Sequence, residues 1–189
     1  MNPLRSARCH HREYKHDRET KLAGLAHRLS SRLPATAQDE ANIGEPGAAP
    51  LEGLRFLVVD DNRVNRIVAV KSLEALGAAA EAVDSGQAAL DAVQIKAFDL
   101  ILMDVNMPDM DGLEATRQLR TLPGPMAQLP VIALTADVMS HHIQRYREAG
   151  MDGFVAKPFS PSQLLHEILR LARDSPAEDA AANASLRSS

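Results

Sequence analysis

The chain has 189 residues and a formal net charge of −4, and 45% of its residues are hydrophobic although only 3% are aromatic. This length suits one ordinary domain with tails, and the mild negative charge argues against nucleic acid as the main partner. The single cysteine, Cys9, excludes an internal disulfide. No apolar run long enough to span a membrane and no signal peptide is visible, so the expected location is the cytoplasm.

The composition divides the chain into three parts. Residues 1–50 are predicted to form a flexible, basic and His-rich extension that ends in an Ala-, Pro- and Gly-rich linker. Residues 54–173 carry strong apolar periodicity and are predicted to be the folded domain. Residues 174–189 lack such periodicity and are predicted to be a disordered tail.

The N-terminal extension contains two patterns with more than one interpretation. Apolar residues recur at helical spacing over residues 22–33, which fits a short docking helix or, as we favour, a marginal helix that frays in isolation. Cys9 lies near His10, His11 and His16, but their spacing matches no standard metal site. Neither pattern predicts a function for the extension.

Strand and helix patterns alternate through the predicted domain. Strands are expected at residues 54–60, 78–83, 99–104, 130–135 and 153–158. Helices are expected at residues 64–76, 85–97, 112–120 and 138–149, and from residue 161 onward.

Local signals support the first and last of these helices. The first is predicted from the helical spacing of four apolar residues, Val64, Ile67, Val68 and Leu76. Ser160, Pro161 and Gln163 form a capping-box arrangement that opens the last helix. The apolar stripe of that helix consists of Leu164, Leu165, Ile168, Leu169 and Ala172.

This alternation predicts the fold class. Strands that are apolar on both faces belong in a parallel sheet that is covered on both sides. Right-handed crossovers then give an α/β domain with a doubly wound, five-stranded parallel sheet and helices on both faces. Because ligands of such sheets bind outside the carboxyl ends of the strands, we expect the chemistry at the residues that end each apolar run.

Polar residues stand at these strand ends. The first strand ends in Asp60 and Asp61, the third in Asp104 and the fourth in Thr135, and the fifth approaches Lys157. Carboxylates that lie a few ångströms apart raise each other's pKa by repulsion, and a divalent cation relieves that repulsion. Oxygen ligands with room for water suit Mg²⁺, so the sequence predicts a magnesium site at this edge.

The same groups are suited to phosphoryl transfer. A carboxylate can attack phosphorus while a metal ion and an ammonium group neutralise the charge on the equatorial oxygens. We therefore predict that Asp104 becomes phosphorylated, and that Lys157 and Thr135 assist the transfer.

Four motifs carry a family resemblance. "VVDDN", "MDVNMPDMDG", "IALTAD" and "GFVAKPF" occur in that order over residues 54–173 and resemble the receiver domain of two-component response regulators. Their wording is most similar to receivers attached to hybrid sensor histidine kinases. The resemblance implies a flavodoxin-like sheet with strand order 2-1-3-4-5.

The resemblance also assigns residue roles around the metal. It implies that Asp104 is the phospho-acceptor and that Asp60 and Asp61 are the acidic pair, with Asp61 as the direct Mg²⁺ ligand and Asp60 acting partly through water. It implies that Asn106 offers its backbone carbonyl to Mg²⁺. Lys157 matches the lysine that pairs with the phosphate, and Pro158 falls where the family has a cis peptide bond.

Further positions correspond to the family's switch and lifetime residues. Thr135 matches the switch hydroxyl, and Phe154 matches the aromatic residue that rotates, although plain core packing is the alternative for that ring. The resemblance implies that Asn106 and Asp137 influence how fast the acyl phosphate hydrolyses, while the small Ala136 leaves it accessible.

The predicted function is a phosphoryl-accepting signalling switch. The resemblance implies that phosphate arrives from a phosphohistidine of a sensor histidine kinase or a histidine-phosphotransfer protein. Residues 138–173 are the expected surface for a downstream protein target. We expect no nucleic-acid or membrane partner, no DNA-binding output domain, and no enzymatic activity beyond the protein's own phosphorylation and slow dephosphorylation.

The sequence leaves three alternatives to this interpretation. The chain could be the C-terminal receiver part of a hybrid histidine kinase rather than a free-standing relay protein. It could also be a receiver-like scaffold that is never phosphorylated. A haloacid dehalogenase-type phosphatase is disfavoured because Asn106 stands where that class needs a second acid to donate a proton.

Several residues near the motifs also have simple structural interpretations. Asp60 and Asp61 alone would suit a helix N-terminus. Turn and helix-start roles are favoured over metal binding for Asp109 and Asp111. Loop packing is expected for the two methionines of this segment and solvent exposure for the paired histidines, namely Met107, Met110, His141 and His142.

Overall fold

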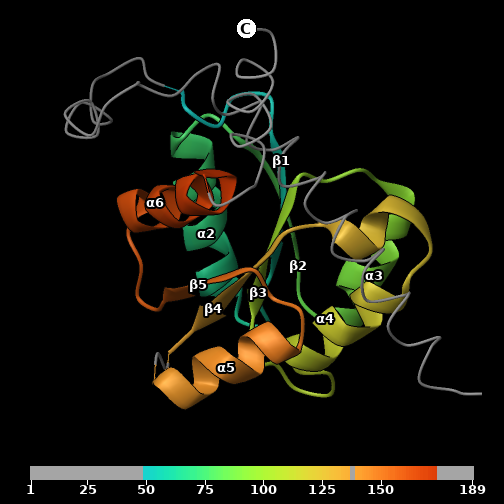
Figure 1. Ribbon diagram of the computed structural model, residues 1–189. Helices are drawn as coiled ribbons and strands as arrows, with labels where there is room; N and C mark the ends of the chain where they lie inside the picture. The colour runs from blue at the N-terminus through green and yellow to red at the C-terminus, as the bar shows by residue number, and fades with distance from the viewer. Residues whose placement is uncertain (1–48, 137–138, 174–189) are drawn as a thin grey trace, which may run out of the picture.

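The computed structural model describes residues 49–136 and 139–173. Its strands are β1 (Arg55–Val59), β2 (Ala79–Val83), β3 (Leu100–Asp104), β4 (Val131–Thr135) and β5 (Gly153–Ala156). Its helices are α2 (Arg63–Ala75), α3 (Gly86–Ile95), α4 (Gly112–Thr121), α5 (Ser140–Glu148) and α6 (Pro161–Arg173) (Figure 1). The predicted alternation is confirmed, and a short 3-10 helix that was not predicted, η2 (Gly124–Gln128), precedes β4.

Some predictions concern residues outside this range. They include those for residues 1–48 and 174–189 and for Asp137, and they stay predictions. Within the described domain, Leu51 is fully buried and its backbone N–H donates to the Leu76 carbonyl at 3.0 Å. The packed structure therefore includes residues before position 54.

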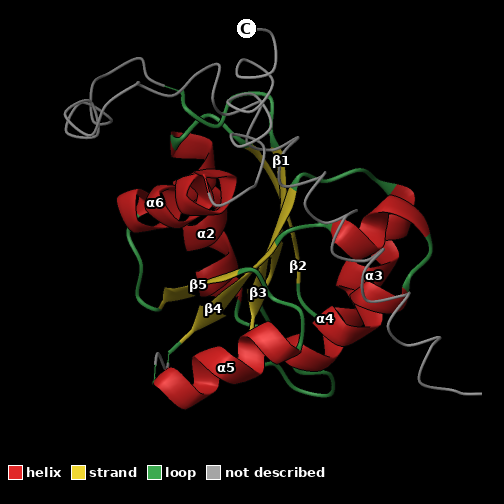
Figure 2. Cartoon of the chain, in the orientation of Figure 1, coloured by secondary structure: helices red, strands yellow, loops and turns green. Residues whose placement is uncertain are grey.

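The strands form one parallel sheet in the order β2-β1-β3-β4-β5 (Figure 2). This order and the doubly wound architecture confirm the predicted fold. Every residue of β3 and of β4 is buried, which explains why both read as continuous apolar runs. The register places Met103 beside Val59 and Asp104 beside Leu134, so the carboxyl ends of β1, β3 and β4 lie at one edge.

Two hydrophobic cores lie on opposite faces of the sheet. Helices α2 and α6 cover one face, where they pack against alternate strand residues such as Leu102 and Leu134. Helices α3, α4 and α5 cover the other face, where they meet the intervening residues such as Met103 and Ala133 (Figure 1). Successive residues of one strand therefore point into different cores.

Helix α2 is present as predicted, but three of the four residues whose spacing predicted it lie on its solvent-exposed side. Val64, Ile67 and Val68 are 66%, 52% and 46% exposed, whereas Ala69 and Leu73 are buried on the other side of the helix together with Ser72. The buried side combines the large side chain of Leu73 with two small residues, Ala69 and Ser72. Three of the four residues whose spacing predicted the helix thus face solvent, whereas the fourth, Leu76, is buried at its end.

Helix α6 begins and packs as predicted. The Ser160 Oγ accepts from the Gln163 N–H at 3.2 Å, and the Gln163 Oε1 accepts from the Ser160 N–H at 2.8 Å, which is a capping box. The predicted apolar stripe is buried along its whole length.

Among the described residues, none of the helices has both the length and the apolar character that a membrane span requires.

Candidate functional site

Three carboxylates meet at the carboxyl edge of the sheet. Asp60 and Asp61 directly follow β1, and Asp104 is the last residue of β3, the neighbouring strand. One oxygen from each carboxylate lies within 4.8 Å of the others. Asp60 and Asp104 are buried, whereas Asp61 is exposed. The parallel register therefore brings together the three acids that the sequence placed at strand ends.

Lys157 joins this cluster from the end of β5. Its Nζ lies 2.6 Å from the Asp60 Oδ2 and 2.9 Å from the Asp104 Oδ2, so it bridges the two buried carboxylates. The Lys157 backbone N–H donates to the Thr135 carbonyl at 2.7 Å, which fixes the lysine to the end of β4. The peptide bond between Lys157 and Pro158 is cis, as the family resemblance implied.

The first turn of α2 holds Asp60 in place. The Asp60 Oδ1 accepts from the Asn62 N–H at 2.9 Å and from the Asn65 Nδ2 at 3.2 Å. The Arg66 Nη1 donates to the Asp60 carbonyl at 2.7 Å and to the Asp61 carbonyl at 3.0 Å. Asn65 and Arg66 were not predicted from the sequence, although polar residues one helical turn after a strand-end acid are a signal that could identify them.

The electrostatic environment of Asp104 has two opposing parts. Burial raises the pKa of Asp104 above its ordinary value, and the negative charge of Asp60 raises it further. The hydrogen bond and positive charge of Lys157 lower that pKa in part, as does the Asn106 N–H, which donates to the Asp104 Oδ1 at 3.2 Å. Asp104 is thus a buried carboxylate held by one neighbouring cation.

The loop from β3 to α4 packs closely beneath Asp104. A side chain at Gly112 would collide with the Asp104 carbonyl oxygen, so glycine is required by this close approach. Asp109 adopts a turn conformation with φ 63°, and Asp111 caps α4 by accepting from the Glu114 N–H at 2.7 Å. The predicted turn and helix-start roles of these two acids are confirmed. So is the loop packing of the methionines Met107 and Met110.

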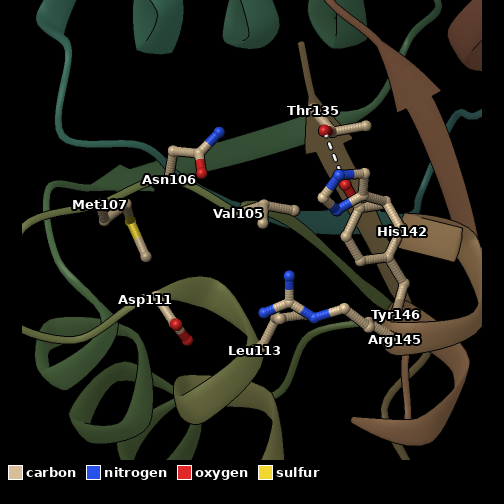
Figure 3. Close-up of a pocket in the computed structure, with 9 residues that line it drawn as sticks. All are labelled: Val105, Asn106, Met107, Asp111, Leu113, Thr135, His142, Arg145 and Tyr146. Atoms are coloured by element: carbon tan, nitrogen blue, oxygen red, sulfur yellow. Dashed lines mark hydrogen bonds between the residues drawn. The ribbon is translucent and has the colours of Figure 1, made fainter. Parts of the chain in front are cut away.

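Thr135 and Tyr146 connect the edge of the sheet to α5. Thr135 ends β4, and its Oγ1 lies 2.9 Å from the Tyr146 Oη in a buried hydrogen bond (Figure 3). Both residues line a cavity of about 540 Å³ that also borders the β3–α4 loop. His142 stacks on the Tyr146 ring with centroids 6.5 Å apart and is half-buried, so the prediction of a solvated His142 is wrong. Tyr146 was not singled out from the sequence.

Phe154 lies on β5 at the position of the predicted switch aromatic. Its side chain is half-buried and packs against the core that α3, α4 and α5 cover. Its backbone N–H donates to the Glu167 Oε1 at 3.0 Å, which ties β5 to α6. Its position is consistent with both the switch role and the packing role considered for this residue.

Comparison with known proteins identifies the domain. Residues 56–169 match the response regulator receiver domain family. The chain belongs to this family. A receiver domain is a phosphoryl-accepting signalling switch, which agrees with the function predicted from the strand-end residues.

Curated relatives are histidine kinases that carry such a receiver. The chain is 42% identical over 144 residues to the sensor protein GacS of Pseudomonas syringae pv. syringae, covering 74% of this chain and 15% of that protein. It is 37% identical over 138 residues to the aerobic respiration control sensor protein ArcB of Escherichia coli, covering 72% of this chain and 18% of ArcB. The chain therefore spans less than a fifth of the length of these relatives.

Solved receiver domains have the same fold. The receiver domain of the sensor histidine kinase PA1611 of Pseudomonas aeruginosa is 34% identical with a TM-score of 0.59, and the match covers 65% of this chain and 99% of that one. The PA1611 structure has a magnesium ion coordinated in its active-site cleft. The chemotaxis protein CheY4 of Vibrio cholerae is 31% identical with a TM-score of 0.59, and the match covers 62% of this chain and 98% of that one.

The residues of this receiver fit a magnesium ion. The acidic group offers only oxygen atoms, two of its carboxylates are buried, and Asp61 opens the cluster to water. Mg²⁺ favours such a set because it retains several waters and takes one or two carboxylates. Among the described residues, Lys157 pairs with two of the three carboxylates, and Arg66 bonds to the backbone carbonyls of Asp60 and Asp61. Three negative charges still exceed these two positive ones, and a divalent cation would neutralise the excess.

Proposed function

We propose that Asp104 is the phosphoryl acceptor of this receiver domain in a Mg²⁺-dependent reaction. The observation that carries the proposal is the Lys157 ammonium group, which bridges Asp104 and Asp60 inside a cluster of three carboxylates. A buried carboxylate that is paired with only one cation keeps an electron pair available for attack on phosphorus.

Each residue of the cluster has a role in this proposal. Asp60, Asp61, Asp104 and the Asn106 backbone carbonyl would hold the Mg²⁺, which when bound neutralises charge on the phosphoryl oxygens. Lys157 supplies a second positive charge next to the same oxygens. An Asp104 carboxylate oxygen forms the new bond to phosphorus, the bond from phosphorus to the donor breaks, and its electron pair leaves with the donor.

The proposed donor is a phosphohistidine on a sensor histidine kinase or a histidine-phosphotransfer protein. When the phosphorus–nitrogen bond breaks, the electron pair stays on the imidazole nitrogen, which then takes a proton.

The solvent-facing stripe of Val64, Ile67 and Val68 on α2 lies one helical turn or two from exposed Asp61. Apolar residues that are exposed together mark protein contacts, so we assign this stripe to the donor. The cytoplasm is the proposed location because the ATP that charges such kinases is there.

The proposed output is a change in protein contacts made by residues 138–173, or onward passage of the phosphoryl group in a relay. Phosphorylation can shift the populations of two conformations only if the phosphoryl group contacts them differently. Thr135 and Phe154 are the proposed contacts that differ. The domain can carry out this role as a free-standing protein or as the C-terminal part of a hybrid kinase, and the proposal holds for both.

The proposed activity is limited to the domain's own phosphorylation and its slow reversal by water. Asn106 is exposed beside the acceptor, where it can orient an attacking water molecule. We propose that Asn106 and Asp137 together set the lifetime of the acyl phosphate.

Intact-protein mass spectrometry after incubation with Mg²⁺ and acetyl phosphate tests the proposal. We expect one added phosphoryl group on the wild type and on the control Asp109→Asn, which changes an exposed acid of the adjacent loop. We expect none on Asp104→Asn. A wild type that gains no phosphoryl group and binds neither Mg²⁺ nor beryllofluoride would instead indicate a scaffold that is not phosphorylated.

A further inference from the structure

The hydrogen bond between Thr135 and Tyr146 joins the phosphoryl-acceptor site to α5. The two side chains are 1% and 4% exposed, and their oxygens are 2.9 Å apart. Tyr146 comes from a helix that contributes no residue to the acidic cluster. This bond is therefore a direct link between the end of β4 and a helix on the surface of the domain (Figure 3).

The backbone of Thr135 is held in place, so only its side chain can change partner. The Thr135 carbonyl accepts from the Lys157 N–H at 2.7 Å, and the preceding carbonyl, of Leu134, accepts from the Val105 N–H at 3.1 Å. These bonds tie β4 to both of its neighbours at the site. The remaining freedom is rotation about χ1, which for a β-branched side chain has separate staggered positions.

The strand alternation places Thr135 on the face opposite to Asp104. Along β4, Val131 and Ala133 point into the core under α3, α4 and α5, and Thr135 follows them at the same spacing. Along β3, Leu100 and Leu102 point into the other core, and Asp104 follows them. To reach a phosphoryl group on Asp104, the Thr135 hydroxyl must turn away from the α5 side, where Tyr146 now holds it.

Tyr146 also anchors α5 to the domain. Among the residues of α5 whose side chains are described, 142–148, it alone is buried. The cavity of about 540 Å³ beside its ring, bordered by Leu113 and Met107, leaves space into which the ring can move. A change of partner at Thr135 therefore acts on the residue that fixes the position of α5.

We infer that Tyr146 is a positioning residue that competes with the phosphorylated Asp104 for the Thr135 hydroxyl and couples the outcome to α5. In the unphosphorylated domain the hydroxyl bonds to Tyr146, which keeps α5 in place. In the phosphorylated domain the hydroxyl donates to a phosphoryl oxygen, and the tyrosine is released toward the cavity. This inference rests on the proposed function, because it requires a phosphoryl group on Asp104.

The Tyr146→Phe variant tests the competition, with beryllofluoride and Mg²⁺ standing in for the phosphoryl group. Loss of one hydrogen bond from the unphosphorylated state alone should make beryllofluoride bind about threefold to tenfold more tightly. The control Ser72→Ala removes another buried hydroxyl, which donates within α2 to the Val68 carbonyl at 2.8 Å, its sole partner in residues 49–136 and 139–173. We expect the affinity of the control to equal that of the wild type.

The Thr135→Val background separates competition from simple packing. Without the threonine hydroxyl there is nothing to compete for, so Tyr146→Phe should leave beryllofluoride affinity unchanged in that background. An equal gain in both backgrounds would show that the ring acts through packing, and it would overturn the inference. Unchanged or weaker binding by Tyr146→Phe in the wild-type background would also overturn it.

Hydrogen exchange of the α5 amides provides a second readout. It distinguishes coupling through Tyr146 from a purely structural role of this residue. In the wild type, beryllofluoride should increase exchange in α5, and in Tyr146→Phe this increase should be smaller because the link is already absent. A wild type that fails to bind beryllofluoride would defeat the proposed function and this inference together. Binding by a wild type whose α5 exchange does not respond would defeat the inference alone.

Discussion

The two ends of the sheet each bury carboxylates beside a cation, but the charges are matched at only one end. At the amino end, the Arg120 Nη2 pairs with the Asp152 Oδ2 at 3.0 Å, and both side chains are largely buried. The guanidinium group also donates to the carbonyls of Gly150, Ala127 and Leu129. At the carboxyl end, among the described residues, three clustered carboxylates stand against two cations: Lys157, which pairs with two of them, and Arg66, which bonds only to backbone carbonyls there.

This difference separates a stabilising site from a reactive one. A buried cation with one carboxylate and several carbonyl partners is satisfied in charge and in hydrogen bonds, so it fastens α4 to the start of β4 and β5. A cluster with excess negative charge costs folding free energy until a cation binds. The cluster whose positive and negative charges match is thus a structural one. The cluster with more negative than positive charge is the place where a metal ion and a phosphoryl group would bind.

The largest expected effect is at the amino end. Arg120→Met should lower the free energy of unfolding by about 3–5 kcal/mol, because the buried Asp152 carboxylate loses its cation. Arg117→Met in the same helix is the matched control, since Arg117 is exposed and, within the described part of the chain, pairs with exposed Glu114 alone. Urea unfolding should place the control within about 0.5 kcal/mol of the wild type. Equal losses for the two variants would mean that the Arg120 network is not a specific stabilising site.

The next effect is on the rate of phosphorylation at the carboxyl end. Lys157→Gln should slow phosphorylation by acetyl phosphate by roughly two to three powers of ten, because a preorganised positive charge is lost beside the phosphoryl oxygens. Lys96→Gln removes a lysine that also pairs with a carboxylate, but far more exposed, at 2.6 Å from Glu81. Its rate should equal that of the wild type. If Lys157→Gln is phosphorylated as fast as the wild type, the metal ion alone neutralises the charge on the phosphoryl oxygens.

A smaller effect is expected on metal affinity. Asp61→Asn should weaken Mg²⁺ binding by roughly one to two powers of ten, because a full negative charge is removed a few ångströms from the cation. The readout is the rise in melting temperature with increasing Mg²⁺, which follows from binding to the folded state. Asp109→Asn should keep the wild-type response. If both variants keep it, Asp61 is not a ligand.

The smallest effect concerns the pH dependence of stability without metal. Because burial raises the pKa of Asp104 in the folded state, its contribution to stability is largest at low pH and is lost as the pH rises through that pKa. In the presence of a chelator, Asp104→Asn should therefore have a higher free energy of unfolding than the wild type near pH 7. The difference between these two free energies should become smaller as the pH falls. A wild type that is the more stable protein at pH 7 would show that Lys157 outweighs burial.

The sequence was sufficient for the fold and for most of the site because both depend on strand ends. A buried strand reads as an apolar run wherever it lies, and parallel strands bring their last residues to one edge. Asp60, Asp104, Thr135 and Lys157 could therefore be predicted before any distance was known. The strand order came from the family resemblance rather than from the pattern.

The predictions that failed or were missing depend on side-chain direction. The apolar spacing of α2 gives a period, but it does not say which face of the helix meets the sheet. Ala69, Ser72 and Leu73 form the buried side of α2, and Leu76 alone of the predicting residues is buried. Tyr146 and Arg120 find their partners across 11 and 32 positions of sequence, and no local pattern encodes such pairs. His142 is half-buried and stacks on Tyr146, and no local pattern in the sequence shows how deeply this part of α5 packs against the domain.

The two faces of α2 have a consequence for how this receiver could acquire new partners. Ala69, Ser72 and Leu73 hold the helix to the sheet, whereas Val64, Ile67 and Val68 contribute little to the core. Surface substitutions away from buried features usually change stability by no more than about 0.5 kcal/mol. Substitutions of the residues that we assign to donor recognition should therefore change the stability of the domain very little. A duplicated copy could diverge in kinase specificity while its fold stayed the same.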